Sequence, residues 1–283
     1  MVSTSTSTSW RQAIERDGYV VVPGALPKES LEPVLQDMWE HTGARPDDRE
    51  SWYKKGIVRA NGMVEMYHYQ SMWNNRQDPR LYEVFSDILG THKLWVSLDR
   101  VNLKPPADDE RYPEHSQKGF IHWDTDTSVY PNIPFRVQAV LALTDTDDSM
   151  GGFQCVPELY RDLADWFPRQ PADRNPRVPD MTGYSITKVP MKGGDLVVWS
   201  TLMPHGNGHN VSGRPRLAQY ITMHVANEAD DELRQTRINC WQKNLPPPGT
   251  AFPGDPRETE QKRGKVADLT PLGRKLLGAD RWE

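Results

Sequence analysis

Residues 119–124 read Gly119-Phe120-Ile121-His122-Trp123-Asp124, and they indicate both the fold and the chemistry of this chain. The segment predicts a β-strand, in which side chains point alternately to the two faces. His122 and Asp124 therefore point to the same side, with Cα atoms roughly 6–7 Å apart, or two strand rises. An imidazole and a carboxylate at that separation can bind one metal ion.

A third ligand would come from farther along the chain. His205 directly follows an expected strand over residues 195–203, where a barrel would aim a side chain inward. Its rival His209 lies four residues later in a turn-rich run, and His224 is interpreted as a core histidine of the last strand. Asp126 shares the strand parity of the first two ligands and stays open as a ligand or as a partner of one. Two histidines and one carboxylate on one face of an octahedral iron leave the other face open for a co-substrate and O2.

An arginine beyond the second histidine could hold a carboxylate through two parallel hydrogen bonds. Arg214 and Arg216 are two residues apart, so strand parity does not separate them. Arg216 lies deeper in the apolar strand, and a buried guanidinium requires an anionic partner. A bound dicarboxylate would provide that partner, so the residues together predict an Fe(II) oxygenase that uses 2-oxoglutarate and O2.

Around these residues the sequence predicts many short strands, separated by turns rich in Gly and Pro. This pattern is typical of a β-sandwich or barrel with helices packed on one side. The expected helices cover residues 10–16, 27–40, 78–89, 158–166 and 272–277, and the expected strands cover 19–23, 94–103, 120–124, 135–143, 184–190, 195–200 and 216–226.

The composition excludes several classes of protein. Hydrophobic residues make up 36% of the 283 residues, and ten Trp and ten Tyr can supply large buried areas. The net charge is −5 without a long basic run, which makes nucleic acid and anionic membranes poor partners. No stretch approaches 18 apolar residues, so no membrane span is expected. Two cysteines are too few for a disulfide framework, which favours the reducing cytoplasm.

We expect one main domain. Residues 1–9 form a Ser/Thr-rich segment that should be disordered, without the features of a secretory signal. Residues 10–227 would form the oxygenase domain with its N-terminal helices. Residues 228–283 would form a polar C-terminal extension packed on the same domain. The sequence does not indicate an oligomeric state.

The sequence also resembles the phytanoyl-CoA dioxygenase-like family of Fe(II)/2-oxoglutarate-dependent oxygenases, over roughly residues 10–227. This resemblance implies a mainly β fold with flanking helices, built on a double-stranded β-helix, or cupin-like jelly-roll, core. The similar segments are Asp17–Gly24, His122–Asp124, Gly151–Pro157, Gly194–Trp199, and His205 with Arg216 eleven residues later.

The resemblance implies a role for each candidate residue. His122, Asp124 and His205 would bind iron, and the eleven-residue spacing favours His205 over His209 and Arg216 over Arg214. Arg216 would bind the distal carboxylate of 2-oxoglutarate. The resemblance further implies that Asn102 helps to hold the other end of the co-substrate, with Gln138 as a second candidate for that duty.

The chain departs from the family pattern at one point, and a second position distinguishes it from related halogenases. Residues 158–161 read Glu-Leu-Tyr-Arg, where family members often have a Gly-Ser-His turn, and this could change the adjacent lid. Asp124 is a carboxylate, whereas related halogenases have a small residue at that position to admit halide. Halogenation is therefore not expected.

The expected reaction is oxidation, by default hydroxylation, of a C–H bond in a small organic molecule, with release of succinate and CO2. Secondary metabolism is the expected setting. Desaturation, ring formation or epoxidation would use the same residues. Two alternatives from other classes stay open: a cupin-like metalloenzyme that uses another metal for non-oxidative chemistry, and a catalytically inactive relative that only binds ligands.

Overall fold

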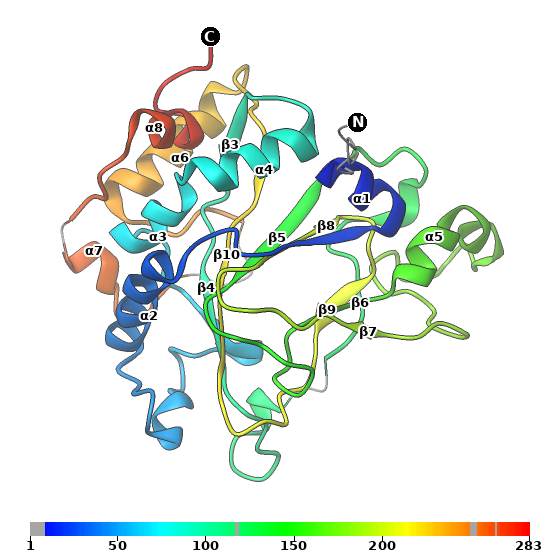
Figure 1. Ribbon diagram of the computed structural model, residues 1–283, viewed down its shortest axis with the longest axis horizontal. Coiled ribbons are helices and arrows are strands. Elements are labelled where there is room, and N and C mark those ends of the chain that lie inside the picture. Colours follow the sequence, from blue (N-terminus) through cyan, green and yellow to red (C-terminus); the bar gives the residue numbers. More distant parts are fainter. Residues whose placement is uncertain (1–8, 117–118, 250–253, 264) are drawn as a thin grey trace, which may run out of the picture.

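The computed structural model describes residues 9–116, 119–249, 254–263 and 265–283 (Figure 1). The segment expected to be disordered, residues 1–9, lies outside this range except for Ser9. The Ser9 hydroxyl accepts a hydrogen bond from the Gln12 amide, and the Gln12 side chain accepts one from the Ser9 amide. This capping box starts the first helix, α1 (Trp10–Asp17).

The centre of the fold is an antiparallel sheet of six strands, in the order β1-β8-β5-β10-β4-β2. Strands distant in sequence pair directly, so that Arg216 lies opposite Lys104 across β10 and β4. The strands are β1 (Tyr19–Val22), β2 (Met63–Val64), β4 (Val101–Lys104), β5 (Val137–Ala142), β8 (Leu196–Ser200) and β10 (Arg216–Tyr220).

A second, smaller sheet faces part of the first. Its order is β7-β6-β9, and an isolated bridge between His122 and His205 adds the metal-motif segment at its edge. A further two-stranded sheet pairs β11 with β3. The arrangement confirms the expected jelly-roll core with flanking helices. These strands are β3 (Leu94–Val96), β6 (Phe153–Cys155), β7 (Thr187–Lys188), β9 (His205–Asn207) and β11 (Met223–Val225).

Strands β5 and β8 are largely apolar, apart from Gln138 and Ser200, because both faces of the large sheet are covered. Leu141 and Val198 pack in the larger core on the helix side, whereas Val140 and Trp199 pack in the core between the sheets. On β10, Ala218 belongs to the core between the sheets. Residues two positions away on either side of it share that inner face.

Helices cover the outer face of the large sheet, mainly on one side of the molecule, while α5 lies apart near the small sheet (Figure 1). Among the described residues, no helix is both long and apolar enough to cross a membrane. The helices besides α1 are α2 (Lys28–Thr42), α3 (Gln70–Arg76), α4 (Pro79–Leu89), α5 (Pro157–Trp166), α6 (Asp231–Lys243), α7 (Thr259–Arg263) and α8 (Pro271–Leu277).

The structure corrects several sequence expectations. Residues 119–124 form no ladder strand, because only His122 pairs with a neighbouring segment. The strands expected at 94–103 and 216–226 are each broken in two, giving β3 with β4 and β10 with β11. Helices α3 and α6 were not expected, since their sequences are largely polar.

The C-terminal region contacts the core through a buried arginine. The Arg237 guanidinium of α6 donates hydrogen bonds to the carbonyls of Val96, Leu276 and Leu277 at 2.7–3.1 Å. It thereby connects α6 to β3 and to the end of α8. We therefore propose that residues 228–283 belong to the same domain as residues 10–227.

Candidate metal centre and co-substrate site

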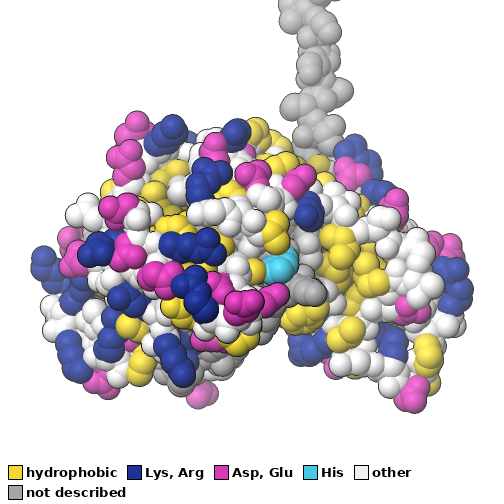
Figure 2. Space-filling model, turned by 90° about the horizontal axis from the view of Figure 1, so that it is seen from below, with side chains coloured by type: hydrophobic (Ala, Val, Ile, Leu, Met, Phe, Trp, Pro, Cys, Tyr) yellow, Lys and Arg dark blue, Asp and Glu magenta, His cyan; other side chains and the backbone are white. Residues whose placement is uncertain are grey.

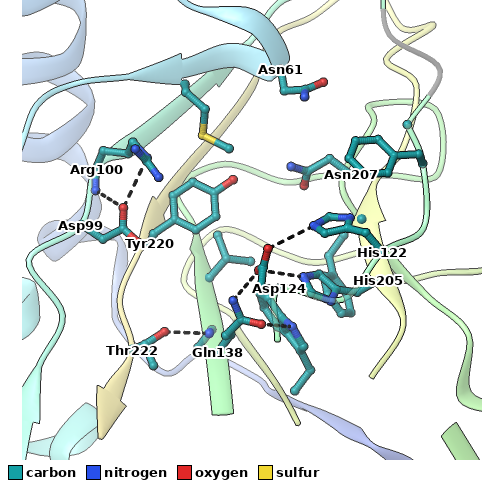
Figure 3. A pocket seen from close by; sticks show the side chains of 18 residues that line it. Asn61, Asp99, Arg100, His122, Asp124, Gln138, His205, Asn207, Tyr220 and Thr222 are labelled. Carbon is teal, nitrogen blue, oxygen red and sulfur yellow. Dashed lines mark hydrogen bonds and ion pairs between the residues drawn. The ribbon is translucent and has the colours of Figure 1, made fainter. Parts of the chain in front are cut away.

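His122, Asp124 and His205 come together although 83 residues separate the first from the last. One ligand atom of each lies within 4.8 Å of the others, the geometry that a shared metal ion requires. The Asp124 carboxylate lies 3.3 Å from Nε2 of His122 and 3.5 Å from Nε2 of His205. His205 is buried, whereas Asp124 is about half exposed, and all three line one cavity (Figure 3).

Backbone contacts bring the two histidines into this position. The His122 amide donates to the His205 carbonyl at 2.9 Å, and the His205 amide donates back at 3.0 Å. Gly206 permits this approach, because a Cβ there would lie 2.2 Å from the Phe120 carbonyl oxygen. Nδ1 of His205 lies 2.9 Å from the Met203 carbonyl, which fixes the proton on Nδ1 and leaves Nε2 free to bind a metal.

Asp124 is held as an ionised carboxylate. Polar contacts with the His122 and His205 rings, together with the hydrogen bond from Gln138, hold the pKa of Asp124 well below its usual value, although burial acts in the opposite direction. The Gln138 amide donates to Asp124 at 2.6 Å and accepts from Nε1 of Trp199 at 3.2 Å. Gln138 therefore lies in the site, directly on a metal-ligand candidate.

The segment after α5 supports the loop that carries Asp124, a contact that the sequence did not reveal. The Trp123 amide donates to the Arg177 carbonyl at 2.9 Å, and the Arg177 guanidinium donates to the Asp124 carbonyl. The Trp123 ring packs edge-on against Trp166 and stacks with Phe167. Residues 157–177 thus fix the backbone on both sides of the Asp124 carboxylate.

The rival residues lie outside the metal group. Asp126 accepts a hydrogen bond from the amide two residues later and caps a short 3-10 helix. His209 and His224 contribute no atom to the group formed by the triad. His224 is only partly buried and packs edge-on against Trp95, and burial lowers its pKa to about 4. Arg214 is exposed and lies 3.6 Å from an acidic side chain on the surface.

Arg216 is almost completely buried, with 1% of its surface exposed. Its Nη1 donates to Oδ1 of Asn102 at 3.0 Å and contacts Oδ1 of Asn207 at 3.4 Å. Its Nε and Nη2 are buried and have no hydrogen-bond partner among the described residues. Because a buried guanidinium without an anion is very costly, this position fits an arginine that receives a carboxylate.

Lys104 adds a second buried positive group opposite Arg216. The side chain is fully buried, and its Nζ donates to the Gly208 carbonyl at 2.5 Å. Burial, and then the charge of Arg216, lower the pKa of Lys104 to about 8. The described residues place no carboxylate in an ion pair with either group. Sequence reasoning missed Lys104 because a lysine before two prolines resembles an ordinary surface turn residue.

The inner faces of β10 and of β4, extended by the preceding Arg100, form a ladder of mostly polar side chains, which we call the β4–β10 ladder. Its rungs follow the antiparallel register, and the last rung is fixed by the Tyr220 amide, which donates to the Arg100 carbonyl at 3.1 Å. From the deep end to the other end, the rungs are Arg216 with Lys104, Ala218 with Asn102, and Tyr220 with Arg100.

The triad opens into a cavity of about 400 Å³. Arg100, Asp99 and Tyr220 lie on the wall opposite the histidines in the close view (Figure 3). Figure 2 shows a histidine side chain near the middle of one molecular face, with hydrophobic side chains on one side and mixed charges on the other. The apolar lining consists of Met63, Phe120, Ala139, Val140, Phe153 and Trp199.

The residues fit Fe(II) and 2-oxoglutarate. Two imidazole nitrogens and one carboxylate are the donor set of non-haem iron oxygenases, and the half-exposed side of Asp124 faces the cavity. The two unpartnered guanidinium nitrogens of Arg216 match the two oxygens of a carboxylate.

Comparisons with known proteins identify a matching family model and related sequences. A family model described as phytanoyl-CoA dioxygenase matches residues 14–218, more than half of the chain. The Ava biosynthesis cluster protein O of Aspergillus versicolor is 22% identical over 264 residues, covering 84% of each chain.

Solved structures support the fold. The epimerase SnoN, in complex with Fe3+, alpha-ketoglutarate and nogalamycin RO, aligns with a TM-score of 0.54 at 20% identity, covering 77% of this chain and 82% of SnoN. GlcNAc Inducible Gene 2 of Candida albicans aligns with a TM-score of 0.66 at 12% identity, covering 96% and 76% of the two chains. At these identities the likeness concerns the fold.

Proposed function

The chain belongs to the phytanoyl-CoA dioxygenase family of 2-oxoglutarate-dependent iron oxygenases, and from this premise we propose that it hydroxylates a C–H bond of a small organic molecule. His122, Asp124 and His205 would hold the Fe(II). When bound, the iron with 2-oxoglutarate and O2 supplies the oxidising power, with release of succinate and CO2.

The observation that carries this proposal is the buried Arg216 guanidinium, with two donor atoms unpartnered among the described residues. A dicarboxylate bound to the metal at one end would place its other carboxylate on Arg216. Asn102 would orient the guanidinium, since its Oδ1 accepts from Nη1 at 3.0 Å and its amide donates to the Asn61 carbonyl at 2.8 Å. In the proposed site Asn102 would therefore lie near the distal carboxylate, and not at the other end of the co-substrate as the resemblance implied.

Gln138 has a different position, nearer the metal. Its amide fixes one oxygen of Asp124, and Trp199 fixes the other end of the Gln138 amide. In the proposed site Gln138 therefore keeps the carboxylate in its ligand orientation and borders the keto-acid end of the co-substrate. The aromatic rings of Phe153 and Trp199, 4.5 Å apart at their centroids, form an apolar part of the cavity wall on this side.

Secondary metabolism is the proposed setting. Two of the similar proteins carry names from natural-product biosynthesis, the Ava cluster protein and the nogalamycin epimerase. The cavity of about 400 Å³ has both polar and aromatic walls, which suits a small molecule with both kinds of group.

An anaerobic visible absorption titration tests the metal and co-substrate assignments. Fe(II) and then 2-oxoglutarate are added to the purified protein, and a weak metal-to-ligand charge-transfer band should require both additions. His205→Ala should abolish the band, whereas the matched variant His209→Ala should retain it. Succinate formation in air then measures turnover. Bound iron without such a band in the unmodified protein would refute the proposal.

A further inference from the structure

We propose that Arg100 and Tyr220, the outermost rung of the β4–β10 ladder, bind a carboxylate of the substrate. This inference rests on the proposed function, because it assumes that 2-oxoglutarate occupies the deep rung. It assigns a substrate class, a small organic acid, to a cavity whose substrate the triad alone does not specify.

The first support is the Tyr220 hydroxyl. Its oxygen is buried and has no hydrogen-bond partner among the described residues, although Tyr220 lines the cavity. Figure 3 shows the ring between Arg100 and the Asp124 side of the site. A buried hydroxyl without a partner is unfavourable, so this position favours a ligand atom that accepts a hydrogen bond.

The second support is the positive charge beside that hydroxyl. Arg100 lines the same cavity with 15% of its side chain exposed. Asp99 contacts Nε of Arg100 at 3.4 Å and its backbone amide at 2.8 Å, which fixes the guanidinium on the cavity wall. Arg76 donates to the Asp99 carbonyl at 2.5 Å and adds a second positive charge behind this wall. Asp99 therefore lies between two guanidinium groups, of which Arg76 also interacts with the buried Glu260.

The third support is a count of carboxylates. 2-Oxoglutarate has two, and the proposed function places one on the metal and one on Arg216. Neither carboxylate of 2-oxoglutarate remains for Arg100. Arg100 lies four residues before Lys104, the residue opposite Arg216, or roughly 13 Å away along the strand. A carboxylate bound by Arg100 and Tyr220 would therefore belong to the second ligand of the cavity.

The chemistry of the rung selects the kind of group. A hydroxyl and a guanidinium on adjacent strands offer convergent donors to an acceptor with two oxygens and a negative charge. Met63, Phe120 and Val140 supply apolar surface in the same cavity. A compact carboxylic acid with an apolar body satisfies both requirements.

Binding of matched acids and amides tests this inference. The probes are hexanoate and 3-phenylpropanoate, each compared with its neutral primary amide, added without oxygen to protein loaded with Fe(II) and 2-oxoglutarate. Dissociation constants come from the change in the charge-transfer band and from equilibrium dialysis. Acids should bind about tenfold more tightly than amides, the expected effect of one charge-assisted hydrogen bond.

Two variants test whether Tyr220 and Arg100 cause the preference for acids over amides. Tyr220→Phe removes only the hydroxyl, and Arg100→Gln removes the charge but keeps a polar side chain of similar reach. Each should reduce the preference for acids to about twofold or less, while the affinity for 2-oxoglutarate stays within about twofold. Arg214→Gln, which changes an exposed arginine, should keep the full preference.

The outcomes are distinguishable. Equal binding of acids and amides by the unmodified protein, or no saturable binding of any probe, would overturn the inference while leaving the charge-transfer band intact. Weaker 2-oxoglutarate binding in Tyr220→Phe or Arg100→Gln would assign the rung to the co-substrate and would also overturn it. Absence of the band in the unmodified protein would instead refute the proposed function.

Discussion

Arg216 and Arg100 stand at opposite ends of the β4–β10 ladder, on its inner face, and they differ in how their charge is balanced. At the deep end, Arg216 and Lys104 are buried together, with no acidic side chain paired to either in the described structure. At the other end, Arg100 lies on the cavity wall in an ion pair with Asp99.

This difference separates two kinds of recognition. The two cationic side chains at the deep end are almost completely buried, so an anion there gains a strong electrostatic interaction and relieves repulsion between two cations. The other end is already partly neutralised, and it reaches solvent through the cavity. We therefore expect the deep end to determine affinity for the co-substrate, and the outer end to determine which second ligand is accepted.

Arg216→Met should have the largest effect. Removing the guanidinium should raise the dissociation constant of 2-oxoglutarate about 100-fold, or about 3 kcal/mol, because a buried charge-assisted pair is lost. The free energy of unfolding of the ligand-free protein should not decrease, since an apolar side chain of similar length replaces an unpaired buried charge. The charge-transfer titration and urea unfolding measure the two effects.

The matched control is Arg214→Met, two residues earlier and exposed. It should leave both quantities unchanged within about 0.5 kcal/mol. A large loss of stability without loss of 2-oxoglutarate affinity in Arg216→Met would show that this arginine is structural, and the contrast between the two ends would fail.

Lys104→Met should weaken 2-oxoglutarate binding about tenfold, since one of two buried cations remains. It should also change the pH dependence of stability. Because the pKa of Lys104 is about 8 in the folded protein, instead of 10.5, the unfolded chain binds more protons between these values. The stability of the ligand-free protein should therefore rise from pH 8 to pH 10.5, and the penalty should be fully present below pH 8.

Urea unfolding at pH 8, 9 and 10 checks this prediction. The rise should be smaller in Lys104→Met than in the unmodified protein, and saturating 2-oxoglutarate should also reduce it by supplying negative charge. If the unfolding free energy changed with pH equally in both proteins, burial of the charged Lys104 would not destabilise the fold. Arg216 would then be the only unfavourably buried cation at the deep end.

Asn102→Ala should have a smaller effect on the deep end. The substitution removes the acceptor that orients Nη1 of Arg216, so 2-oxoglutarate should bind about fivefold more weakly, or about 1 kcal/mol. In a double-mutant cycle with Arg216→Met, Asn102→Ala should cause no additional loss. Full additivity would show that Asn102 contacts the co-substrate independently.

Tyr220→Phe should have the smallest effect on the co-substrate. At the outer end of the ladder, removal of one unpartnered hydroxyl should change 2-oxoglutarate affinity by less than about twofold and should not destabilise the ligand-free protein. Calorimetric titration and thermal unfolding check the two expectations. If Tyr220→Phe lowered 2-oxoglutarate affinity as much as Asn102→Ala, the two ends of the ladder would not have different roles.

The sequence predicted the residues that carry chemistry better than the elements that hold them. His122 and Asp124 do point to the same cavity, but not because they lie in a ladder strand. One backbone bridge to His205 and the contacts of residues 174–177 hold this segment, and neither depends on a local pattern. The alternation of polar and apolar residues along a strand does not predict such long-range contacts.

Burial distinguishes Arg216 from Arg214, which strand parity could not do. Arg214 and Arg216 have the same parity, yet β10 begins at Arg216, and only this arginine is buried. Tyr220 was part of an expected strand, but an aromatic residue in a strand most often belongs to a core, and nothing local indicates an unpartnered hydroxyl. Helix α6 was missed because its sequence has no marked apolar stripe.

The anchoring of the Asp124 loop by residues 157–177 has a consequence for protein engineering. Inserts beside an active site are natural units for exchange between related enzymes, because loops tolerate replacement when the scaffold stays intact. Here Arg177, which belongs to the insert, forms hydrogen bonds with the backbone of Trp123 and Asp124. A chimaera with residues 157–177 from a related enzyme would therefore also need the loop around Trp123 and Asp124 from that enzyme. The two segments should be exchanged together.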